Sequence, residues 1–407
     1  MEKEWVAATL ERLAGIGKTE RGITRLAFDA AERQARQYIG EEMRQAGLTV
    51  RIDAFGNVIG RLEGTVPGAP AVVTGSHLDT VPEGGSYDGA VGVVGALAAI
   101  RHLKAAGPLS HPLEIIVFAA EESSRFGFGT MGSKAMTGTA NISAWNKAQD
   151  QAGVSFAAAL AAEGLDLNRV REAARRREEI KAFVELHIEQ GPVLERAGAR
   201  IGVVEAIAAP TRLRMIVEGT PAHSGTTPME DRQDALVSAA MIILAVQEIA
   251  LEESYRGTVG TVGIVKVHPN VMNVVPGRVE LGVDIRGVDH ESIIDTIQEI
   301  KDAVSTIADG QETPVSIVVL TSEKPVPLHS EIVDTIEDAC RTLSLSCRRM
   351  NSGAGHDAMN MAYIAPTGMI FIPCRAGISH NPDEYAAPDD IMNGIAVLTE
   401  TLQQLAR

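Results

Sequence analysis

The sequence predicts an α/β protein in which a mixed, mostly parallel sheet is interrupted by a second, inserted domain. In the first half, apolar runs that end in polar residues alternate with helical patterns, which is typical of βαβ units covered on both faces. After about residue 210 the order becomes βαββαβ, which indicates a compact two-layer domain. A length of 407 residues, 45% of them hydrophobic, is sufficient for two or three domains.

Several elements of the first half can be placed from their patterns. Asp29 is expected to cap a helix over 30–46, and strands are expected to follow it. Apolar residues 71–77 and 113–122 predict buried strands, and the small-residue segment between them predicts their crossover helix. The charged segment 157–181 predicts a helical connector.

The second half divides into the inserted domain and a return to mixed α/β order. Its strand and helix patterns cover 211–219, 234–253, 258–267, 278–287, 292–308 and 313–320. We therefore expect a ferredoxin-like domain over 211–325 inserted into a discontinuous main domain of 1–210 and 326–407. A buried strand over 368–374 and a closing helix over 389–407 complete the main domain.

Charge and composition limit the partners. The net charge of -16 repels phosphate backbones, so we expect no nucleic-acid partner. Three cysteines in so long a chain fit a reducing compartment better than a disulfide framework. No leader pattern and no long apolar span are apparent, so we expect a cytoplasmic protein that does not enter a membrane.

Polar residues with metal-binding chemistry follow the predicted strands. His77 and Asp79 stand at the end of one strand, and Asp88 follows in a glycine-rich turn. Glu121 and Glu122 end the next apolar run, where one carboxylate can bind a metal while its neighbour acts as a base. Taken alone, the His77–Asp79 pair is more typical of a capped strand end and the Asp88–Gly89 pair of a plain turn, whereas Glu121 and Glu122 are as typical of a solvated strand end as of a metal site.

Two further histidines and an acid extend this pattern. His187 and Glu189 end another apolar strand, and His380 follows the strand over 368–374. Together these side chains would gather at one sheet edge, where imidazole and carboxylate without thiolate suit Zn²⁺, Mn²⁺, Co²⁺ or Ni²⁺. The ligands exceed the needs of one tetrahedral ion, so two divalent metal ions that share a carboxylate are expected.

Eight ordered motifs then resemble a known family. They are GSHLDTV, GxxDGAVGV, EESSRFG, ELHIEQGPVLE, GTPAHSGTTPM, NVVPGRVE with DIR, SGAGHDAM and GISHNPDE. This series resembles the M20 metallohydrolases, in particular their amidase, hydantoinase and carbamoylase branch. The resemblance implies a binuclear metal-dependent hydrolase that acts on non-peptide C–N bonds in linear amides, with the inserted domain as lid and homodimerisation surface.

The resemblance also implies a role for each matching residue. Asp88 would bridge the ions, with Glu122 and His380 completing one site and His77 and His187 the other. Asp79 would orient His77, Glu121 would be the general base, and His223 would stabilise the oxyanion, in this family sometimes from the neighbouring subunit. The expected substrate contacts are Gln190, Asn273, Arg286, Gly353, Gly355 and His356; Arg286 could alternatively pair with surface acids, and His356 could cap a helix.

Substrate choice depends on finer differences. Peptidase members of the family usually carry an acid where His187 stands, so the ureido and carbamoyl branch is favoured. The stretch 207–212, IAAPTR, lacks the Gly-Gln that allantoate-type members tend to carry. We therefore expect hydrolysis of N-carbamoyl-L-amino acids to amino acid, CO₂ and ammonia.

Other functions remain as alternatives. An allantoate amidohydrolase or ureidopropionase would use the same metals on another ureide, and an N-acyl amino acid amidohydrolase or dipeptidase is a more distant alternative. A metal-free binding module of the same fold is opposed by the presence of every expected ligand together with Glu121.

Overall fold

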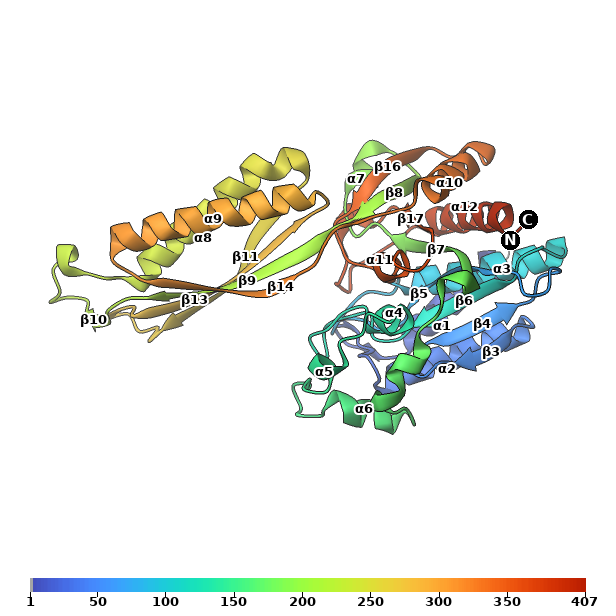
Figure 1. Ribbon diagram of the computed structural model, residues 1–407, viewed down its shortest axis with the longest axis horizontal. Helices are drawn as coiled ribbons and strands as arrows, with labels where there is room; N and C mark the ends of the chain where they lie inside the picture. Colours follow the sequence, from blue (N-terminus) through green and yellow to red (C-terminus); the bar gives the residue numbers. More distant parts are fainter. Residues whose placement is uncertain (1–2) are drawn as a thin grey trace. The chain divides into compact units, whose positions relative to one another are not determined.

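The computed structural model describes residues 3–407, which form two units by their contacts: unit 1 comprises the described residues up to 205 together with 328–407, and unit 2 comprises residues 206–327. Unit 1 is built on a nine-stranded sheet with helices on both faces, and unit 2 on a four-stranded sheet with two long helices (Figure 1).

The sheet of unit 1 is parallel at its centre and antiparallel toward its edges. The order is β15-β8-β17-β7-β5-β6-β4-β3, with β16 paired to β8; β15 and the last two residues of β8 fall at the boundary, within the range assigned to unit 2. Strands β17, β7, β5 and β6 are parallel neighbours, whereas β4 pairs antiparallel with β6 and β8 antiparallel with β17. The bounds are β3 Thr49–Ile52, β4 Val58–Leu62, β5 Ala71–His77, β6 Leu113–Phe118, β7 Ile180–Ile188, β8 Ile201–Ile207, β15 Val326–Pro327, β16 Cys347–Ser352 and β17 Thr367–Ile372.

Helices pack against both faces of this central region. On β7 and β17, Leu186 and Ile372 point to one face, where a Cβ on Gly394 of α12 would meet both of them, whereas His187 and Phe371 point to the other. His356 precedes α11 and contacts the rings of His187 and Phe371. The helices are α1 Lys3–Gly15, α2 Ala30–Gln45, α3 Ala90–Ala106, α4 Met131–Met136, α5 Ile142–Trp145, α6 Phe156–Ala162, α7 Val193–Ala197, α10 Ser330–Thr342, α11 Asp357–Met361 and α12 Pro388–Ala406.

Local sequence explains why β5 and α3 lie so close to β7. All seven residues of β5 are buried, as expected for a β-branched strand covered on both sides. On α3, a Cβ at Gly92 would lie 2.3 Å from the carbonyl oxygen of Leu186. Glycine is therefore needed for the helix to pack directly onto β7, which sets the position of the loop before α3.

The prediction of a helical connector over 157–181 is wrong, because this segment does not form one continuous helix. The chain forms α6, then two 3₁₀ turns, Leu167–Ala173 and Arg177–Glu179, and enters β7 at Ile180. Leu160, Leu167 and Val170 pack into a hydrophobic cluster around Phe156. Burial of this apolar side thus overrides the helix propensity of the charged residues.

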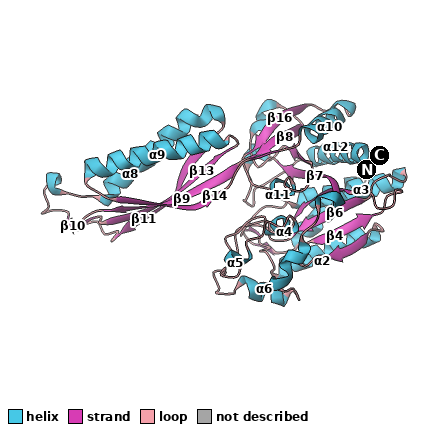
Figure 2. Ribbon diagram, viewed as in Figure 1, coloured by secondary structure: helices cyan, strands magenta, loops and turns pink. Residues whose placement is uncertain are grey.

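Unit 2 has the element order βαββαβ, with an antiparallel sheet in the order β11-β13-β9-β14. Figure 2 shows α8 and α9 together on one side of the unit's strands. Alternate residues of β9 and β13, such as Leu213 and Leu281, share a core with Ile242 of α8 and Ile300 of α9. The bounds are β9 Ala209–Glu218, β10 Ala222–His223, α8 Ala235–Glu252, β11 Val259–His268, β12 Val274–Val275, β13 Arg278–Gly287, α9 His290–Gln311 and β14 Val315–Ser322.

The expectation that the chain contains no long apolar span is wrong for one helix. The segment Ala235–Arg256, which contains α8, is long and apolar enough to cross a membrane by length and composition alone. Core helices of globular domains pass the same test, and Ala239, Ile242 and Val246 of this helix are buried against the sheet. The opposite side of α8 carries exposed apolar side chains, namely Leu236, Val237, Met241, Leu244 and Leu251.

Candidate active site

The predicted metal ligands come together at the carboxyl ends of the parallel strands. His77 ends β5, His187 lies one residue before the end of β7, and Glu122 follows β6. His380 follows β17, and Asp88 lies in the loop between β5 and α3. Since parallel strands end at the same edge of a sheet, residues more than 300 positions apart converge on one point.

Asp88 lies at the centre of this cluster. Its Oδ1 is 3.1 Å from Nε2 of His187 and 3.6 Å from Nε2 of His77. Its Oδ2 is 3.2 Å from Nε2 of His380, which is in turn 3.3 Å from Oε1 of Glu122. Two potential ligand groups, His77–Asp88–His187 and Asp88–Glu122–His380, therefore share Asp88 as the predicted bridge requires.

Backbone carbonyls orient the two buried histidines. Nδ1 of His77 lies 3.0 Å from the carbonyl oxygen of Asp79, and Nδ1 of His187 lies 2.9 Å from that of Ile188. A proton on each Nδ1 makes this hydrogen bond and directs Nε2 toward Asp88, so Nε2 is the nitrogen that would give up its proton to bind a metal ion. Both rings are thus held in the orientation that a metal ligand needs.

Gly89 makes room for this arrangement. Its φ is +63°, and a Cβ there would lie 2.6 Å from Nε2 of His77. Any other residue at position 89 would push the imidazole away from Asp88.

Asp79 contacts both glutamates in addition to His77, the one residue that it was expected to orient. Its carboxylate accepts hydrogen bonds from the backbone N–H groups of Glu121 at 3.1 Å and Glu122 at 2.9 Å. Its Oδ1 is 3.7 Å from Nδ1 of His77, so it acts on the ring by charge while its carbonyl oxygen makes the hydrogen bond. One buried aspartate thereby positions an imidazole and both glutamates.

Glu121 and Glu122 do not belong to the strand, so their side-chain directions are not set by the expected alternation of strand residues. Strand β6 ends at Phe118, and Ala120 has a φ of +56°. The resulting turn directs Glu121 toward the cluster, with Oε2 3.8 Å from Nε2 of His77, while Glu122 reaches His380. Glu121 is therefore close to the ligand groups without belonging to either.

Buried negative charge dominates the electrostatics of the site. Burial raises the pKa of Glu121 well above its ordinary value, against the opposing charge of His77. Burial and the charge of Asp88 raise the pKa of Glu122 to about 7. Burial lowers the pKa of His77, but the charges of Glu121 and Asp88 outweigh it and raise this pKa well above the ordinary value.

These shifts have one common cause. Four carboxylates, Asp79, Asp88, Glu121 and Glu122, face the cluster, and three imidazoles cannot offset their charge without taking up protons. Divalent cations offset it directly and leave the imidazoles as neutral ligands. The donor set of imidazole and carboxylate without thiolate suits borderline divalent metals, so the residues fit the implied metal ions.

A third cluster of potential ligands, Glu185, His187 and His356, has a structural explanation. The carboxylate of Glu185 accepts hydrogen bonds from Ser76 Oγ at 2.8 Å and from the N–H of Ala358 at 2.9 Å. Burial and nearby His187 lower the pKa of His356 well below its ordinary value. Glu185 thus ties β7 to β5 and α11.

Glu384 and Ser379 contribute to the site although the sequence did not single them out. Oε1 of Glu384 accepts hydrogen bonds from the N–H groups of Tyr87 at 2.9 Å and Asp88 at 3.0 Å. Its Oε2 accepts a hydrogen bond of 2.8 Å from Ser379 Oγ. Glu384 therefore connects the loop that carries Asp88 with the segment that carries His380.

The predicted substrate contacts of unit 1 occupy different environments. Nε2 of Gln190 lies 3.1 Å from Asp88 Oδ2, so its amide contacts the carboxylate that the two potential ligand groups share. His356 is buried against the ring of His187 and provides no side-chain cap to α11. Gly353 and Gly355 lie in the turn before it, where a Cβ on Gly353 would meet open space.

In unit 2, His223 and Asn273 lie side by side. His223 pairs with Val274 between β10 and β12, and the N–H of Ser224 donates to the carbonyl oxygen of Asn273 at 3.1 Å. The N–H of Gly225 donates to Nδ1 of His223 at 3.0 Å, which leaves Nε2–H as an outward donor. That proton is the one an oxyanion would require.

Arg286 lies on β13 of the four-stranded sheet, whereas His223 lies in the separate two-stranded sheet of β10 and β12. Arg286 pairs with Pro210, where the chain enters β9, and its Nε donates to Asp284 at 2.7 Å. The extended strand from Arg278 to Arg286 spans about 27 Å. His223 belongs to β10, which pairs with β12 and lies beyond the Arg278 end of β13 (Figure 1). Arg286 and His223 of one chain therefore cannot hold the same small substrate.

Comparison with known proteins identifies relatives over nearly the whole chain. The model of peptidase family M20/M25/M40 matches residues 73–404. A ureidoglycolate hydrolase of Oryza sativa subsp. japonica is 40% identical over 389 residues, 94% of this chain and 80% of the relative. An N-carbamoyl-L-amino acid amidohydrolase of Geobacillus stearothermophilus is 40% identical over 400 residues, 98% of this chain and 97% of the relative.

A solved structure agrees with the fold. The crystal structure of an amidase of the hydantoinase/carbamoylase family from Burkholderia multivorans superposes with a TM-score of 0.90 at 35% identity. The match covers 99% of this chain and 98% of that chain.

Replacing Glu384 by Gln is expected to weaken divalent-metal binding by about 10- to 100-fold, because the side chain loses the charge that orders the Asp88 loop. Competitive titration of Mn²⁺ or Zn²⁺ against a chromogenic chelator measures the change. Glu331→Gln, on the exposed side of α10, is the matched control. Equal metal affinity in Glu384→Gln and wild type would show that Glu384 does not position the ligands.

Proposed function

The chain belongs to peptidase family M20/M25/M40, and from this premise we propose that it hydrolyses the ureido C–N bond of N-carbamoyl-L-amino acids. Its relatives and its ligand groups make it a hydrolase of C–N bonds in linear amides. One observation supports the proposal most strongly: a single carboxylate, Asp88, is shared by two sets of potential metal ligands. We infer two divalent ions per chain, with His77 and His187 on one and Glu122 and His380 on the other.

A ureido carbonyl is a poor electrophile, so its hydrolysis needs an activated nucleophile and stabilisation of the developing oxyanion. Divalent ions, when bound, polarise the carbonyl and provide a nucleophile at neutral pH. The proton transfers are assigned to a side chain of the protein. Glu121, held by its backbone N–H to Asp79, takes a proton from the attacking water and passes it to the leaving nitrogen.

Arg286 is proposed to bind the carboxylate of the substrate. Its Nε and one terminal nitrogen bond to Asp284, which fixes the guanidinium plane while a terminal nitrogen stays available. Gln190, which touches Asp88 Oδ2, is positioned to contact the ureido group next to the bridging carboxylate.

A second ureide, ureidoglycolate, is also a candidate substrate, because relatives named for either substrate are equally similar to this chain. The ureidoglycolate hydrolase of rice and the N-carbamoyl-L-amino acid amidohydrolase of Geobacillus are each 40% identical to this chain. Both substrate types present a carboxylate and a terminal ureido group, so the proposed contacts of Arg286 and Gln190 serve either one. Allantoate belongs to the same chemical class, and only turnover distinguishes these substrates.

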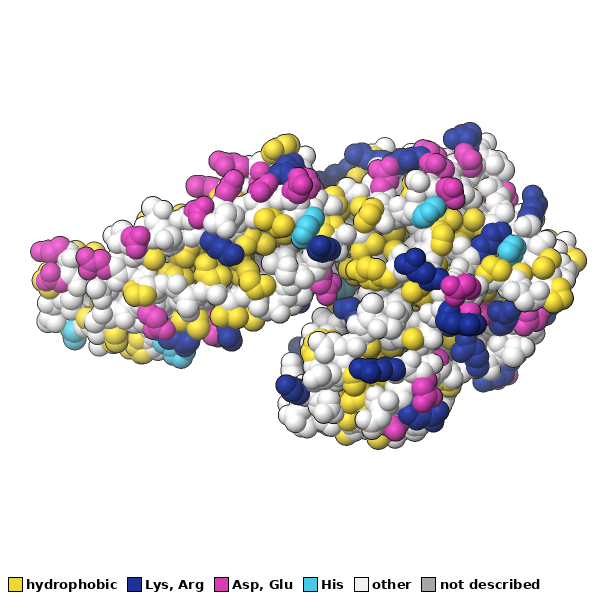
Figure 3. Space-filling view, viewed as in Figure 1, with side chains coloured by type: hydrophobic (Ala, Val, Ile, Leu, Met, Phe, Trp, Pro, Cys, Tyr) yellow, Lys and Arg dark blue, Asp and Glu magenta, His cyan; other side chains and the backbone are white. Residues whose placement is uncertain are grey.

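We further propose that the protein is a homodimer in which His223 acts on the active site of the partner. Most of the large hydrophobic side chains that are exposed belong to unit 2, and hydrophobic side chains are visible over its surface in Figure 3. Val237, Met241 and Leu244 form one exposed stripe on α8, and Ile264 and Val265 are exposed on the edge strand β11. An apolar helix face beside a free strand edge is typical of a surface that pairs with a second copy.

The separation within unit 2 supports this assignment. Arg286 lies at the end where the chain enters the unit, and His223 lies about 27 Å or more away along β13. If Arg286 serves the active site of its own chain, the Nε2–H of His223 has to serve another.

The substrate is tested by measuring ammonia and amino acid released from N-carbamoyl-L-amino acids, N-carbamoyl-β-alanine, ureidoglycolate, allantoate and N-acetyl amino acids by Mn²⁺-loaded protein. We expect turnover of the carbamoyl amino acids, and a loss of about 100- to 10,000-fold in Glu121→Gln, because the base is removed. Glu178→Gln, at an exposed surface position, should retain full activity. Turnover confined to another ureide would contradict the proposal that N-carbamoyl-L-amino acids are the substrate. Turnover only of N-acetyl compounds would contradict the proposal that the substrate is a ureide.

Mixing two inactive variants tests whether His223 acts across the dimer. After Glu121→Gln and His223→Ala proteins are unfolded together and refolded, mixed dimers contain one site with intact Glu121 and an intact partner His223. About a quarter of wild-type activity should return, since half of the dimers are mixed and each has one complete site. No recovery in dimers shown to be mixed would place His223 in the active site of its own chain.

A further inference from the structure

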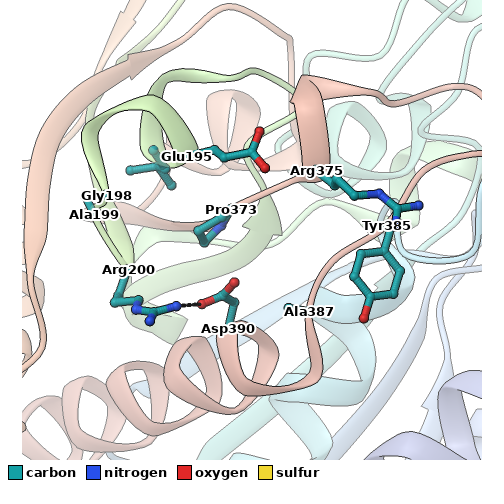
Figure 4. Close-up of a pocket in the computed structure, with 10 residues that line it drawn as sticks. Glu195, Gly198, Ala199, Arg200, Pro373, Arg375, Tyr385, Ala387 and Asp390 are labelled. Atoms are coloured by element: carbon teal, nitrogen blue, oxygen red, sulfur yellow. Dashed lines mark hydrogen bonds and ion pairs between the residues drawn. The ribbon is translucent and has the colours of Figure 1, made fainter.

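A separate cavity of unit 1 lies behind the segment that carries His380. It has a volume of about 350 Å³, lies between α7, the turn at Arg375 and the first turn of α12, and is partly open to solvent, so that Glu195, Arg200 and Arg375 are exposed (Figure 4). None of the residues that line it belongs to the potential metal ligands. Its size is within the range of cavities that hold small molecules.

The cavity is lined by two guanidinium groups and two carboxylates. Arg200 and Asp390 pair with each other at 3.0 Å. Arg375 instead stacks on Tyr385, with its guanidinium carbon 4.5 Å from the ring centroid. Across residues 3–407, no carboxylate lies within ion-pair distance of Arg375, so its N–H donors are available to a ligand.

Glu195 supplies the complementary charge next to Arg375. Its Oε2 accepts a hydrogen bond of 2.8 Å from the N–H of Ala376, the neighbour of Arg375 in the chain. Its Oε1 has no hydrogen-bond partner within the described part of the chain. Figure 4 shows the ends of Glu195 and Arg375 along one side of the cavity, and the Arg200–Asp390 pair along another.

We propose that this cavity binds a small zwitterion of the amino-acid type. The planar guanidinium of Arg375 receives its carboxylate through paired N–H donors, and Oε1 of Glu195 receives its ammonium group. Because the four charged side chains sum to zero, a ligand that carries both charges is matched better than a simple anion or cation. Pro373 and Leu194 offer an apolar wall for a short side chain.

The cavity is connected to the ligand segment at both ends. The N–H of Arg375 donates to the carbonyl oxygen of Tyr385 at 2.9 Å, which closes the segment that contains His380 and Glu384. The ring of Tyr385 also makes an edge contact with Tyr87, the neighbour of Asp88, at a centroid distance of 5.9 Å. A ligand on Arg375 therefore acts on the segment that supplies one metal ligand.

The reaction proposed above releases an amino acid, which belongs to this ligand class. That connection rests on the proposed function, whereas the site itself does not, because binding can be measured without turnover.

Isothermal titration of the purified protein with glycine and L-alanine tests the proposal, with acetate and methylammonium as half-ligands. We expect both amino acids to bind more tightly than either half-ligand. Arg375→Met should weaken their binding by about 10- to 100-fold, the usual cost of a lost charged hydrogen-bond partner. Glu195→Gln keeps an oxygen for the N–H of Ala376 but removes the charge, so it should weaken amino-acid binding and leave acetate binding unchanged.

Arg286→Met is the matched control, because Arg286 is the proposed carboxylate contact of the catalytic substrate. Binding lost in Arg286→Met but kept in Arg375→Met would place the amino acid elsewhere and overturn the proposal. If acetate binds as tightly as L-alanine, the cavity is a simple anion site, and the proposal that it binds a zwitterion is contradicted. Absence of binding to the wild-type protein would show that the cavity holds no such ligand.

Discussion

The confinement of four carboxylates among three imidazoles is the constraint on which the rest of the site depends. Asp79 and Asp88 are buried and Glu121 is largely buried, and burial raises the pKa of Asp79 and Glu121. Such a group of acids is stable as ions only when positive charge is placed among them. Divalent cations would meet that need, and backbone N–H donors hold the acids around the point where the two potential ligand groups meet.

Each element of that preparation has a local cause. The small residue Gly89 lets Asp88 approach His77, and two carboxylates bind backbone N–H groups rather than metals. Asp79 orders Glu121 and Glu122, while Glu384 orders Asp88. The potential ligands are thereby held in place through the backbone, which would reduce the entropic cost of binding a cation.

The sequence was sufficient to predict the convergence of the ligands but not the contacts that support them. His77, His187 and His380 could be found because each follows an apolar strand, and parallel strands end at one edge. Glu384 could not, since its partner Asp88 lies 296 positions away and nothing in the local pattern links them. Glu185 did carry a signal: an acid inside an otherwise apolar strand needs a buried partner, and that partner is Ser76.

The fold was predicted best where packing and propensity agree. The strands and helices of unit 2 follow alternating and helical patterns, and the structure contains them in the expected order. The connector before β7 was mispredicted, because the apolar side of a charged segment packs around Phe156 in several short turns. The positions of Glu121 and Glu122 likewise depend on the positive φ of Ala120, which no periodicity reveals.

Electron paramagnetic resonance of the Mn²⁺-loaded protein tests most directly whether Asp88 joins two cations. Two ions that share one carboxylate lie about 3.5 to 4 Å apart, close enough for their spins to couple. The account predicts an exchange-coupled spectrum with two ions per chain in the wild type, and loss of the coupling in Asp88→Ala. A spectrum of isolated Mn²⁺ with a single ion per fully loaded wild-type chain would contradict it.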